Sequence, residues 1–203
     1  MSEGVFAHWP NRITLLRFLG SLVLFLVFSL VGDELDRSAR YAGLAFWLFI
    51  AIAATDYLDG YLARRGNLIT SFGRIADPFV DKVLVIGAMV YLAVLQWSHH
   101  WFPAWIVVAV VAREFLVTGI RGYVESQGLA FPADWFGKIK MIVQCVAIAV
   151  VLAIQAFDWP VVLRGFLEYA AHVFVWGTLV TTVGSGTSYV LKTRRLLLEG
   201  KRA

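Results

Sequence analysis

The sequence predicts an all-α integral membrane protein with six transmembrane helices, and both its composition and the spacing of its apolar segments indicate this class. Of the 203 residues, 60% are hydrophobic and 16% are charged, and the mean hydropathy is +0.73. A water-soluble domain of this length would expose too much apolar surface. Apolar segments instead recur along the whole chain, each about long enough to cross the roughly 30 Å hydrocarbon core of a bilayer.

The expected helices follow one another through short connections, at about 12–31, 40–65, 75–97, 103–124, 138–157 and 167–191. The first carries Arg17 and lacks a convincing small-residue cleavage site, so we expect it to be retained rather than removed as a signal peptide. The second and third are joined by a short turn containing Gly66 and Asn67, which makes them antiparallel neighbours.

The last two helices carry weaker signals. Trp105 and Trp135 lie near helix ends, where tryptophan is typical of an anchor at the membrane interface. The sixth helix contains Gly184-Ser185-Gly186, and such small residues are typical of close helix packing or of a lipid groove. No segment remains for a soluble domain, so residues 1–203 are predicted to form a single membrane domain.

The distribution of basic residues predicts the orientation of these helices. With the N-terminus in the cytoplasm, only Arg37, Arg40 and Arg164 of the 18 lysines and arginines fall on the outer side. Cytoplasmic loops of membrane proteins usually carry such an excess of positive charge, so both termini are predicted to face the cytoplasm. The sequence pI of about 9.4 then reflects topology and attraction to anionic lipid headgroups, and it does not imply nucleic-acid binding.

Four aspartates lie at the predicted cytoplasmic ends of the second and third helices: Asp56, Asp59, Asp77 and Asp81. At about 100° per residue, the two of each helix share one face, and the short turn makes these faces oppose each other. Carboxylates within apolar helices are costly unless positive charge compensates them. Four negative charges match two divalent cations, and hard oxygen ligands suit Mg²⁺ or Mn²⁺. The alternative, that both pairs merely cap helix ends, does not explain four acids on facing surfaces.

Small residues and one arginine accompany these acids and favour a site for a phosphate-bearing ligand. Gly60, Ala63 and Gly73 lie on the same helix faces and leave space for a bulky group to approach the backbone. Arg64 can pair with phosphate oxygens. A pair of cations held here would neutralise a pyrophosphate and stabilise charge on a leaving phosphate. The pattern therefore predicts two-metal phosphoryl transfer.

The stretch from Asp56 to Asp81 resembles the signature of the CDP-alcohol phosphotransferase family, D-x2-D-G-x2-A-R-x8-G-x3-D-x3-D, at every specified position. The resemblance implies six transmembrane helices around a polar cavity open to the cytoplasm, in a homodimer of the bacterial inner membrane. It implies attack of an alcohol on the β-phosphorus of a CDP-linked lipid, with release of CMP. The four aspartates would be the metal ligands, and Asp81 would also be the general base. The residues implied to contact the cytidine nucleotide are Gly60, Ala63, Arg64 and Gly73.

Three further segments resemble the branch of this family that uses sn-glycerol 3-phosphate as acceptor and CDP-diacylglycerol as donor. They begin at Pro10, Arg113 and Trp135, so the resemblance spans roughly residues 9 to 150. The candidate residues for binding the glycerol phosphate are Arg113, Arg121, Lys138, Thr14 and Arg17. A phosphate-bearing acceptor needs several such donors.

Purely structural interpretations remain open for some of these residues. Thr14 and Arg17, with Asn11, form a polar stripe that could equally be a helix cap and a snorkelling arginine. Lys138 is less clear than the two arginines, and Lys140 could equally be an ordinary positive flank of its helix.

The acceptor and the class of protein also have alternatives. A basic cluster argues against serine as acceptor but discriminates poorly against inositol phosphate, and phosphatidylglycerol would make the chain a cardiolipin synthase of the same family. A cation transporter would explain intramembrane aspartates as ion ligands. It would not explain why all four acids lie at one membrane face with no polar path continuing outward.

Overall fold

The computed structural model describes residues 9–31, 35–66, 71–128 and 135–199, without the side chains of 10, 31, 35–39, 56–66, 71, 72, 74 and 195–199. Within these residues the chain forms six helices: α1 (Trp9–Val31), α2 (Leu35–Gly66), α3 (Ser71–Val94), α4 (Ala104–Ser126), α5 (Trp135–Ala156) and α6 (Val161–Glu199). The all-α class is confirmed, and each of the six predicted segments corresponds to one helix.

All six helices are longer than the sequence predicts, and α6 differs the most. α6 has 39 residues and extends beyond both ends of the apolar segment at 167–191. Its first turns contain an ion pair between Arg164 and Glu168, at 3.1 Å between Nε and Oε1, and such pairs support a helix at polar ends. α3 begins four residues earlier than predicted, at Ser71, so Pro78 lies about two turns from its start. A proline at this depth removes one intrahelical hydrogen bond, because it has no backbone N–H.

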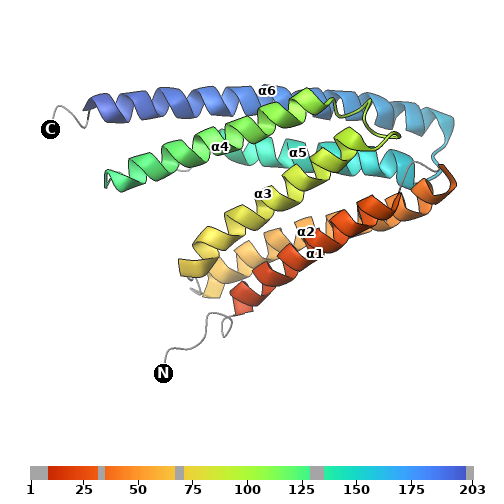
Figure 1. The fold of residues 1–203 in the computed structure, drawn as a ribbon, viewed down its shortest axis with the longest axis horizontal. Coiled ribbons are helices and arrows are strands. Elements are labelled where there is room, and N and C mark those ends of the chain that lie inside the picture. The colour runs from red at the N-terminus through yellow and green to blue at the C-terminus, as the bar shows by residue number, and fades with distance from the viewer. Residues whose placement is uncertain (1–8, 32–34, 67–70, 129–134, 200–203) are drawn as a thin grey trace.

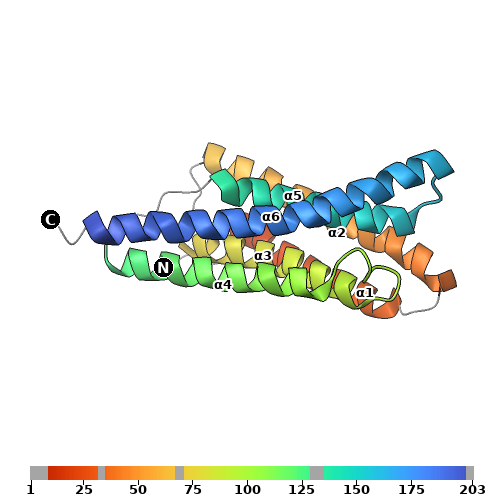
Figure 2. The ribbon, with the colours of Figure 1, turned by 90° about the horizontal axis from the view of Figure 1, so that it is seen from above.

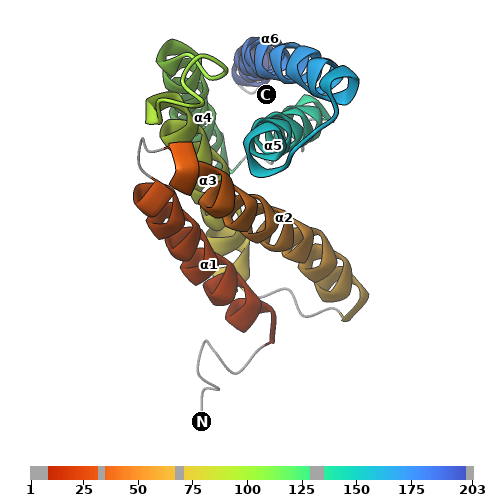
Figure 3. The same ribbon diagram turned by 90° about the vertical axis from the view of Figure 1, so that its right-hand side faces the viewer.

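Consecutive helices run in alternating directions (Figures 1 and 2). The start of α1, the end of α2 and the start of α3 therefore lie at the same end of the bundle as the end of α4, the start of α5 and the end of α6. α1 packs on α2 and α3, α2 packs on α5, and α6 packs on α4 and α5. Viewed along the bundle, α4 and α6 lie on the opposite side from α1, with α3 between α1 and α4 (Figure 3).

The core contains large apolar side chains from several helices, among them Phe28, Phe49, Met89, Ile106 and Ile148, each with 1% exposure or less. These residues come from five different helices, so one continuous core joins the bundle. It fixes the relative positions of the polar side chains that lie nearer the end of the bundle where α3 begins.

Close contact between α1 and α3 depends on Gly87. A Cβ at this position would lie 2.1 Å from Cζ of Phe25, and the Phe25 ring stacks on Tyr91 with 5.8 Å between ring centroids. The ring is therefore held on both sides and has little room to move. The glycine allows α1 to approach α3 closely, and α3 carries the candidate carboxylates nearer its start.

Three of the described helices are long and apolar enough to cross a membrane: Asn11–Leu30, Trp135–Ala156 and Val161–Arg194. Only 33%, 44% and 22% of their most apolar windows are buried inside the protein. Large apolar side chains on several helices are exposed, among them Leu16, Val108 and Phe115, as is expected where lipid is the solvent. The fold is therefore consistent with a helical membrane protein.

Candidate functional site

Two of the four predicted acids, Asp77 and Asp81, lie one turn apart on α3 and face α1. The Thr14 hydroxyl donates a hydrogen bond to Oδ1 of Asp77 at 2.6 Å. The Arg17 guanidinium forms an ion pair with Oδ1 of Asp81. Thr14 and Arg17 are both 4% exposed, so the polar stripe of α1 is buried against these acids. We call Asp77, Asp81, Thr14 and Arg17 the carboxylate half of the site.

The polar stripe of α1 therefore has a defined role in the structure. The alternative interpretation, a helix cap with a snorkelling arginine, does not fit a guanidinium that is buried and paired with a carboxylate. Asn11, one turn before Thr14, is also buried, at 1% exposure. The structure brings Thr14 and Arg17 to the carboxylates, whereas the sequence analysis assigned them to the glycerol phosphate.

The remaining residues of the signature are less fully described. Asp56, Asp59, Gly60, Ala63 and Arg64 belong to the last turns of α2, but their side chains lie outside the described residues. Within the described residues, α2 and α3 are not among the helix pairs that pack closely on each other, and the end of α2 lies apart from the start of α3 in Figures 2 and 3. The prediction that these helices are antiparallel neighbours with facing acids is therefore not confirmed by the described part of the chain. Gly73, one turn before Asp77, is buried.

The chemistry of the carboxylate half fits a hard divalent cation. Asp77 and Asp81 supply two carboxylates on one helix face, and oxygen ligands of this kind bind Mg²⁺ and Mn²⁺. Among the side chains that the structure describes, no group of three or more His, Cys, Asp and Glu residues could hold a metal ion. Two of the four predicted ligands are outside that set, so the described pair is half of the predicted ligand set.

A second cluster is built around Glu114 of α4. Its Oε1 accepts a hydrogen bond from Arg113 Nη1 at 2.7 Å and an ion pair from the Lys140 ammonium of α5. Its Oε2 lies 3.8 Å from Nζ of Lys82 on α3. Glu114, Arg113 and Lys140 are 8%, 9% and 7% exposed. We call Lys82, Arg113, Lys140 and Glu114 the cation cluster.

Hydroxyl groups from two helices extend this cluster. Lys82 Nζ donates a hydrogen bond to Thr118 Oγ1 of α4 at 2.7 Å. Arg113 Nε donates to Ser185 Oγ of α6 at 3.1 Å. Side chains of α3, α4, α5 and α6 thus meet at one place. Charged side chains that are buried together need hydrogen-bond partners of this kind for their remaining donors and acceptors.

The predicted acceptor residues fall into two groups. Arg113 lies in the cation cluster, and Arg121 lies two turns further along α4, where its Nη2 donates to the Tyr189 hydroxyl at 3.0 Å. The Tyr189 ring also contacts Arg113, with 5.4 Å between the guanidinium carbon and the ring centroid, so it links the two arginines. Lys138 is exposed and lies over the Trp135 ring at 5.8 Å. The structure does not bring Lys138 to the other two.

Several polar residues of the cluster were not found by sequence reasoning. Lys140 was considered equally well explained as a flank, yet it is buried and ion-paired. Neither Glu114 nor Lys82 is among the candidate site residues that the sequence indicates. A carboxylate in an apolar helix is itself a signal, because such a group needs a cationic partner. Applied to Glu114, that rule predicts a cationic partner, although it does not identify which lysine or arginine it is.

The two halves of the site meet on α3. Asp81 pairs with Arg17 of α1, and the next residue, Lys82, contacts Thr118 and Glu114 of α4. Successive residues of a helix point about 100° apart, so these two charges serve different neighbours. α3 therefore separates a negatively charged region from a positively charged one at one level of the bundle.

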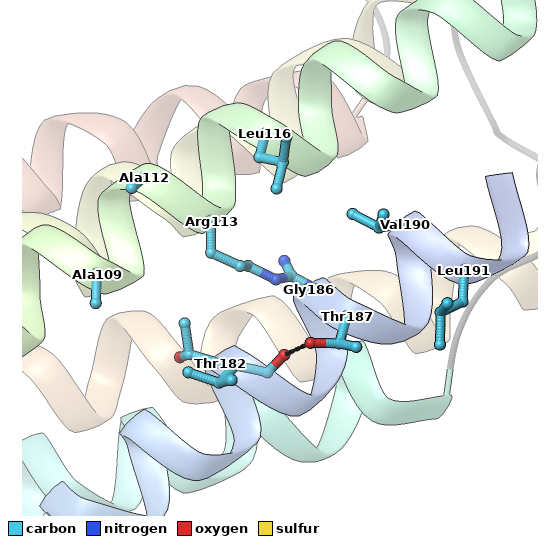
Figure 4. A pocket seen from close by; sticks show the side chains of 10 residues that line it. Ala109, Ala112, Arg113, Leu116, Thr182, Gly186, Thr187, Val190 and Leu191 are labelled. Atoms are coloured by element: carbon cyan, nitrogen blue, oxygen red, sulfur yellow. Dashed lines mark hydrogen bonds between the residues drawn. The ribbon is translucent and has the colours of Figure 1, made fainter. Parts of the chain in front are cut away.

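An apolar pocket of about 400 Å³ lies between α4 and α6, beside the cation cluster. Figure 4 shows Arg113 extending from α4 toward Gly186 of α6 within it. The lining residues are Ala109, Ala112, Arg113, Leu116, Thr182, Val183, Gly186, Thr187, Val190 and Leu191. A Cβ on Gly186 would lie 3.3 Å from Cγ of Arg113. The small residue predicted to serve packing or a lipid groove therefore leaves room for the arginine.

A helical membrane fold that presents paired carboxylates on one helix face and a buried cation cluster on the next has the features expected of an enzyme that handles phosphate groups in a membrane. The chain belongs to the CDP-alcohol phosphatidyltransferase family, whose sequence profile matches residues 7–184. The match covers the carboxylate half and the cation cluster, and it ends just before Ser185.

Relatives of this family are similar over most of their length. A Bacillus subtilis (strain 168) protein named CDP-diacylglycerol--glycerol-3-phosphate 3-phosphatidyltransferase is 35% identical, over 90% of this chain and 93% of its own. A Rickettsia felis protein of the same name is 29% identical, over 89% of this chain and 92% of its own. A Mycobacterium tuberculosis protein named probable phosphatidylglycerophosphate synthase is 35% identical, over 93% of this chain and 83% of its own.

Proposed function

We propose that this protein transfers the phosphatidyl group of CDP-diacylglycerol to sn-glycerol 3-phosphate, forming phosphatidylglycerophosphate and CMP. The observation that carries the proposal is the placement of two opposite half-sites on consecutive residues of α3. The carboxylate half fits metal-assisted handling of a pyrophosphate, and the cation cluster fits an acceptor that itself carries a phosphate. The names of the relatives, which span most of the chain, support the same reaction.

The donor belongs to the carboxylate half. Asp56, Asp59, Asp77 and Asp81 would hold two divalent cations, Mg²⁺ or Mn²⁺, which when bound neutralise the pyrophosphate and the charge of the departing CMP. Gly60, Ala63 and Gly73 would allow the nucleotide to approach the helix backbones, and Arg64 would pair with its phosphate oxygens. The family signature supports each of these roles.

During the reaction a side chain of the protein has to accept the proton of the attacking hydroxyl group. The acceptor hydroxyl oxygen forms a bond to the β-phosphorus of the donor while the bond from that phosphorus to CMP breaks, and the hydroxyl proton passes to the Asp81 carboxylate. Arg17 holds Asp81 through its ion pair, and Thr14 holds Asp77 through its hydrogen bond. These α1 side chains would orient the two acids for metal binding and proton transfer.

The phosphate of the acceptor would bind at the cation cluster and at the neighbouring Arg121. Arg113 and Arg121 would bind it, because both lie on α4 and are linked through Tyr189. Lys140 and Lys82 add positive charge at the same place. Lys138 is proposed as a further ligand on the resemblance alone, since it lies apart from the cluster.

The topology proposed from the sequence agrees with the arrangement of the helices. All six helices would cross the inner membrane, with both termini and the site facing the cytoplasm. The start of α1 and the end of α6 lie at the same end of the bundle as the start of α3 (Figure 1), as this orientation requires. A homodimer is expected from the family resemblance.

The proposal is tested by CMP release from purified protein in detergent with CDP-diacylglycerol and Mg²⁺. Glycerol 3-phosphate, inositol phosphate, serine and phosphatidylglycerol would each be offered as acceptor. We expect release with glycerol 3-phosphate alone, and loss of release when the metal is chelated. Release with another acceptor would keep the donor chemistry but overturn the acceptor assignment. No release with any acceptor, from folded protein, would favour a cation transporter.

A further inference from the structure

We propose that Glu114 limits the affinity of the cation cluster for phosphate and so acts as a positioning residue for the acceptor and for release of the product. The inference rests on the proposed function in one respect, namely that the phosphate belongs to the acceptor. A binding role for the arginines and lysines does not by itself explain a buried carboxylate at their centre.

The contacts of Glu114 carry the argument. A single oxygen, Oε1, receives both the Arg113 guanidinium and the Lys140 ammonium, and Oε2 lies 3.8 Å from Lys82 Nζ. A phosphate oxygen would seek these same N–H donors, because charge-assisted hydrogen bonds to an anion are the strongest that they can form. Glu114 therefore occupies the position of an anion within the chain, and an incoming phosphate has to share its partners.

The charge of the cluster matches one phosphate group. Lys82, Arg113 and Lys140 contribute three positive charges and Glu114 one negative charge, which leaves two in excess. A phosphate monoester carries about two negative charges near neutral pH. The excess charge of the cluster itself thus equals that of one such group, and Arg121, which lies two turns further along α4, adds one more positive charge. Without Glu114 the excess would be larger by one in either case.

This balance matters because the product retains the same phosphate. Interactions that bind substrate and product equally well do not accelerate the reaction, and they slow product release when they are too strong. A fixed carboxylate beside the bound phosphate repels it and competes for its donors, which lowers affinity for both. Glu114 would in this way hold the three cations together while it keeps the phosphate exchangeable.

Two buried polar atoms next to the cluster are consistent with a ligand there. Gln144 lies one turn beyond Lys140 on α5, and Thr182 lies one turn before Ser185 on α6. Their atoms Nε2 and Oγ1 are buried and have no hydrogen-bond partner among the residues that the structure describes. Buried polar atoms are rarely left in this state, and a polar ligand bound beside the cluster is one way in which they would be satisfied.

A purely structural ion pair predicts the opposite sign of effect. If Glu114 only holds the helices together, its neutralisation loosens the cluster and weakens phosphate binding. If Glu114 limits affinity, its neutralisation strengthens phosphate binding even where it lowers the stability of the protein. The buried cations then lack a counterion within the chain, and phosphate from solution supplies one.

The experiment measures thermal unfolding of the full chain in detergent as inorganic phosphate is added, which does not depend on catalysis. Glu114→Gln is expected to lower the half-saturating phosphate concentration about tenfold, since one charge near the anion is removed, and to show a larger stabilisation by phosphate than the unchanged protein. Glu125→Gln, an exposed glutamate on the same helix, makes the same charge change and should leave the phosphate response unaltered. Equal or weaker phosphate binding by Glu114→Gln would overturn the proposal.

A second variant keeps the test decisive if Glu114→Gln does not fold. Lys82, which is 38% exposed, can lose its charge without leaving a buried group unpaired, and Lys82→Gln should raise the half-saturating phosphate concentration about tenfold. An unchanged value would show that the cluster does not bind phosphate. In the transfer assay, Glu114→Gln should lower KM for glycerol 3-phosphate and lower kcat. Phosphate binding without any transfer would instead locate the failure in the proposed function.

Discussion

The carboxylate half and the cation cluster hold their charges in opposite ways. In the carboxylate half each acid has its own partner on α1, Thr14 for Asp77 and Arg17 for Asp81. In the cation cluster three basic side chains from three helices share one carboxylate, Glu114. Among the contacts that the structure describes, the first arrangement consists of two pairs, and the second is a single network.

This difference has consequences for mutation. Loss of one contact in a set of pairs leaves the other pair intact, so its effects should be local. Loss of the shared carboxylate leaves three cations without their common partner, so its effects should be coupled. The following experiments probe that contrast, from the largest expected effect to the smallest.

Asp77→Asn should abolish activity without unfolding the protein. The substituted amide side chain can still accept the hydrogen bond of Thr14, but it has no charge with which to bind a divalent cation. We expect CMP release to fall by about a thousandfold or more, with a thermal midpoint close to that of the unchanged protein. Asp158→Asn, an exposed acid between α5 and α6, is the control and should keep full activity. Full activity of Asp77→Asn would remove Asp77 from the ligand set.

Glu114→Ala should destabilise the protein by about 3–5 kcal/mol, because it leaves buried cations unpaired. Lys140→Met alone should cost less, since Glu114 retains Arg113 and Lys82. The double variant should be more stable than the sum of the two effects predicts, with a coupling of about 1–3 kcal/mol. Unfolding in detergent measures all three. Additive effects would show that the cluster is a set of independent pairs after all.

Gly87→Ala should affect the carboxylate half more than the cation cluster. The new methyl group would clash with the Phe25 ring and separate α1 from α3, at a cost of about 1–3 kcal/mol. We expect a lower thermal midpoint and a higher Mg²⁺ requirement, with little change in KM for glycerol 3-phosphate. Gly122→Ala is the control, because a Cβ there meets no atom within 4 Å. A change in acceptor KM equal to the change in metal requirement would show that the two halves are not separable.

Arg121→Ala should mainly raise KM for glycerol 3-phosphate, by about tenfold, because it removes one charged donor from the acceptor side. Tyr189→Phe removes only the hydroxyl that accepts the Arg121 hydrogen bond, and it should have a smaller effect of the same kind. Initial rates at saturating CDP-diacylglycerol measure both variants. An unchanged KM for Arg121→Ala would make Arg121 an ordinary basic flank of α4.

The sequence predicted the carboxylate half better than the cation cluster, for a physical reason. The spacing of Asp77 and Asp81 fixes their common face, because rotation per residue within one helix is known. The same rule placed Asn11, Thr14 and Arg17 on one stripe. The six helices were also predictable, because each requires only a long apolar segment, although the polar ends of α6 extend well beyond the apolar part.

The cation cluster depends on relations between helices, which periodicity does not contain. Nothing in the sequence near Lys140 shows that it faces Glu114 of another helix rather than solvent. Likewise, Lys138 and Lys140 are only two residues apart, yet one is exposed and the other buried. Which of them turns inward is decided by how α5 packs on its neighbours.

The adjacency of Asp81 and Lys82 on α3 has a consequence for how such an enzyme can diverge. Because the two halves share this one helix and otherwise draw on different helices, substitutions in α4, α5 and α6 can alter the accepted alcohol while the acids opposite α1 stay unchanged. A chimera that combines α1–α3 of this chain with the later helices of a relative should inherit its donor from the first part and its acceptor from the second. Preferences for new headgroup alcohols can therefore arise in this fold while the donor chemistry at the acids stays the same.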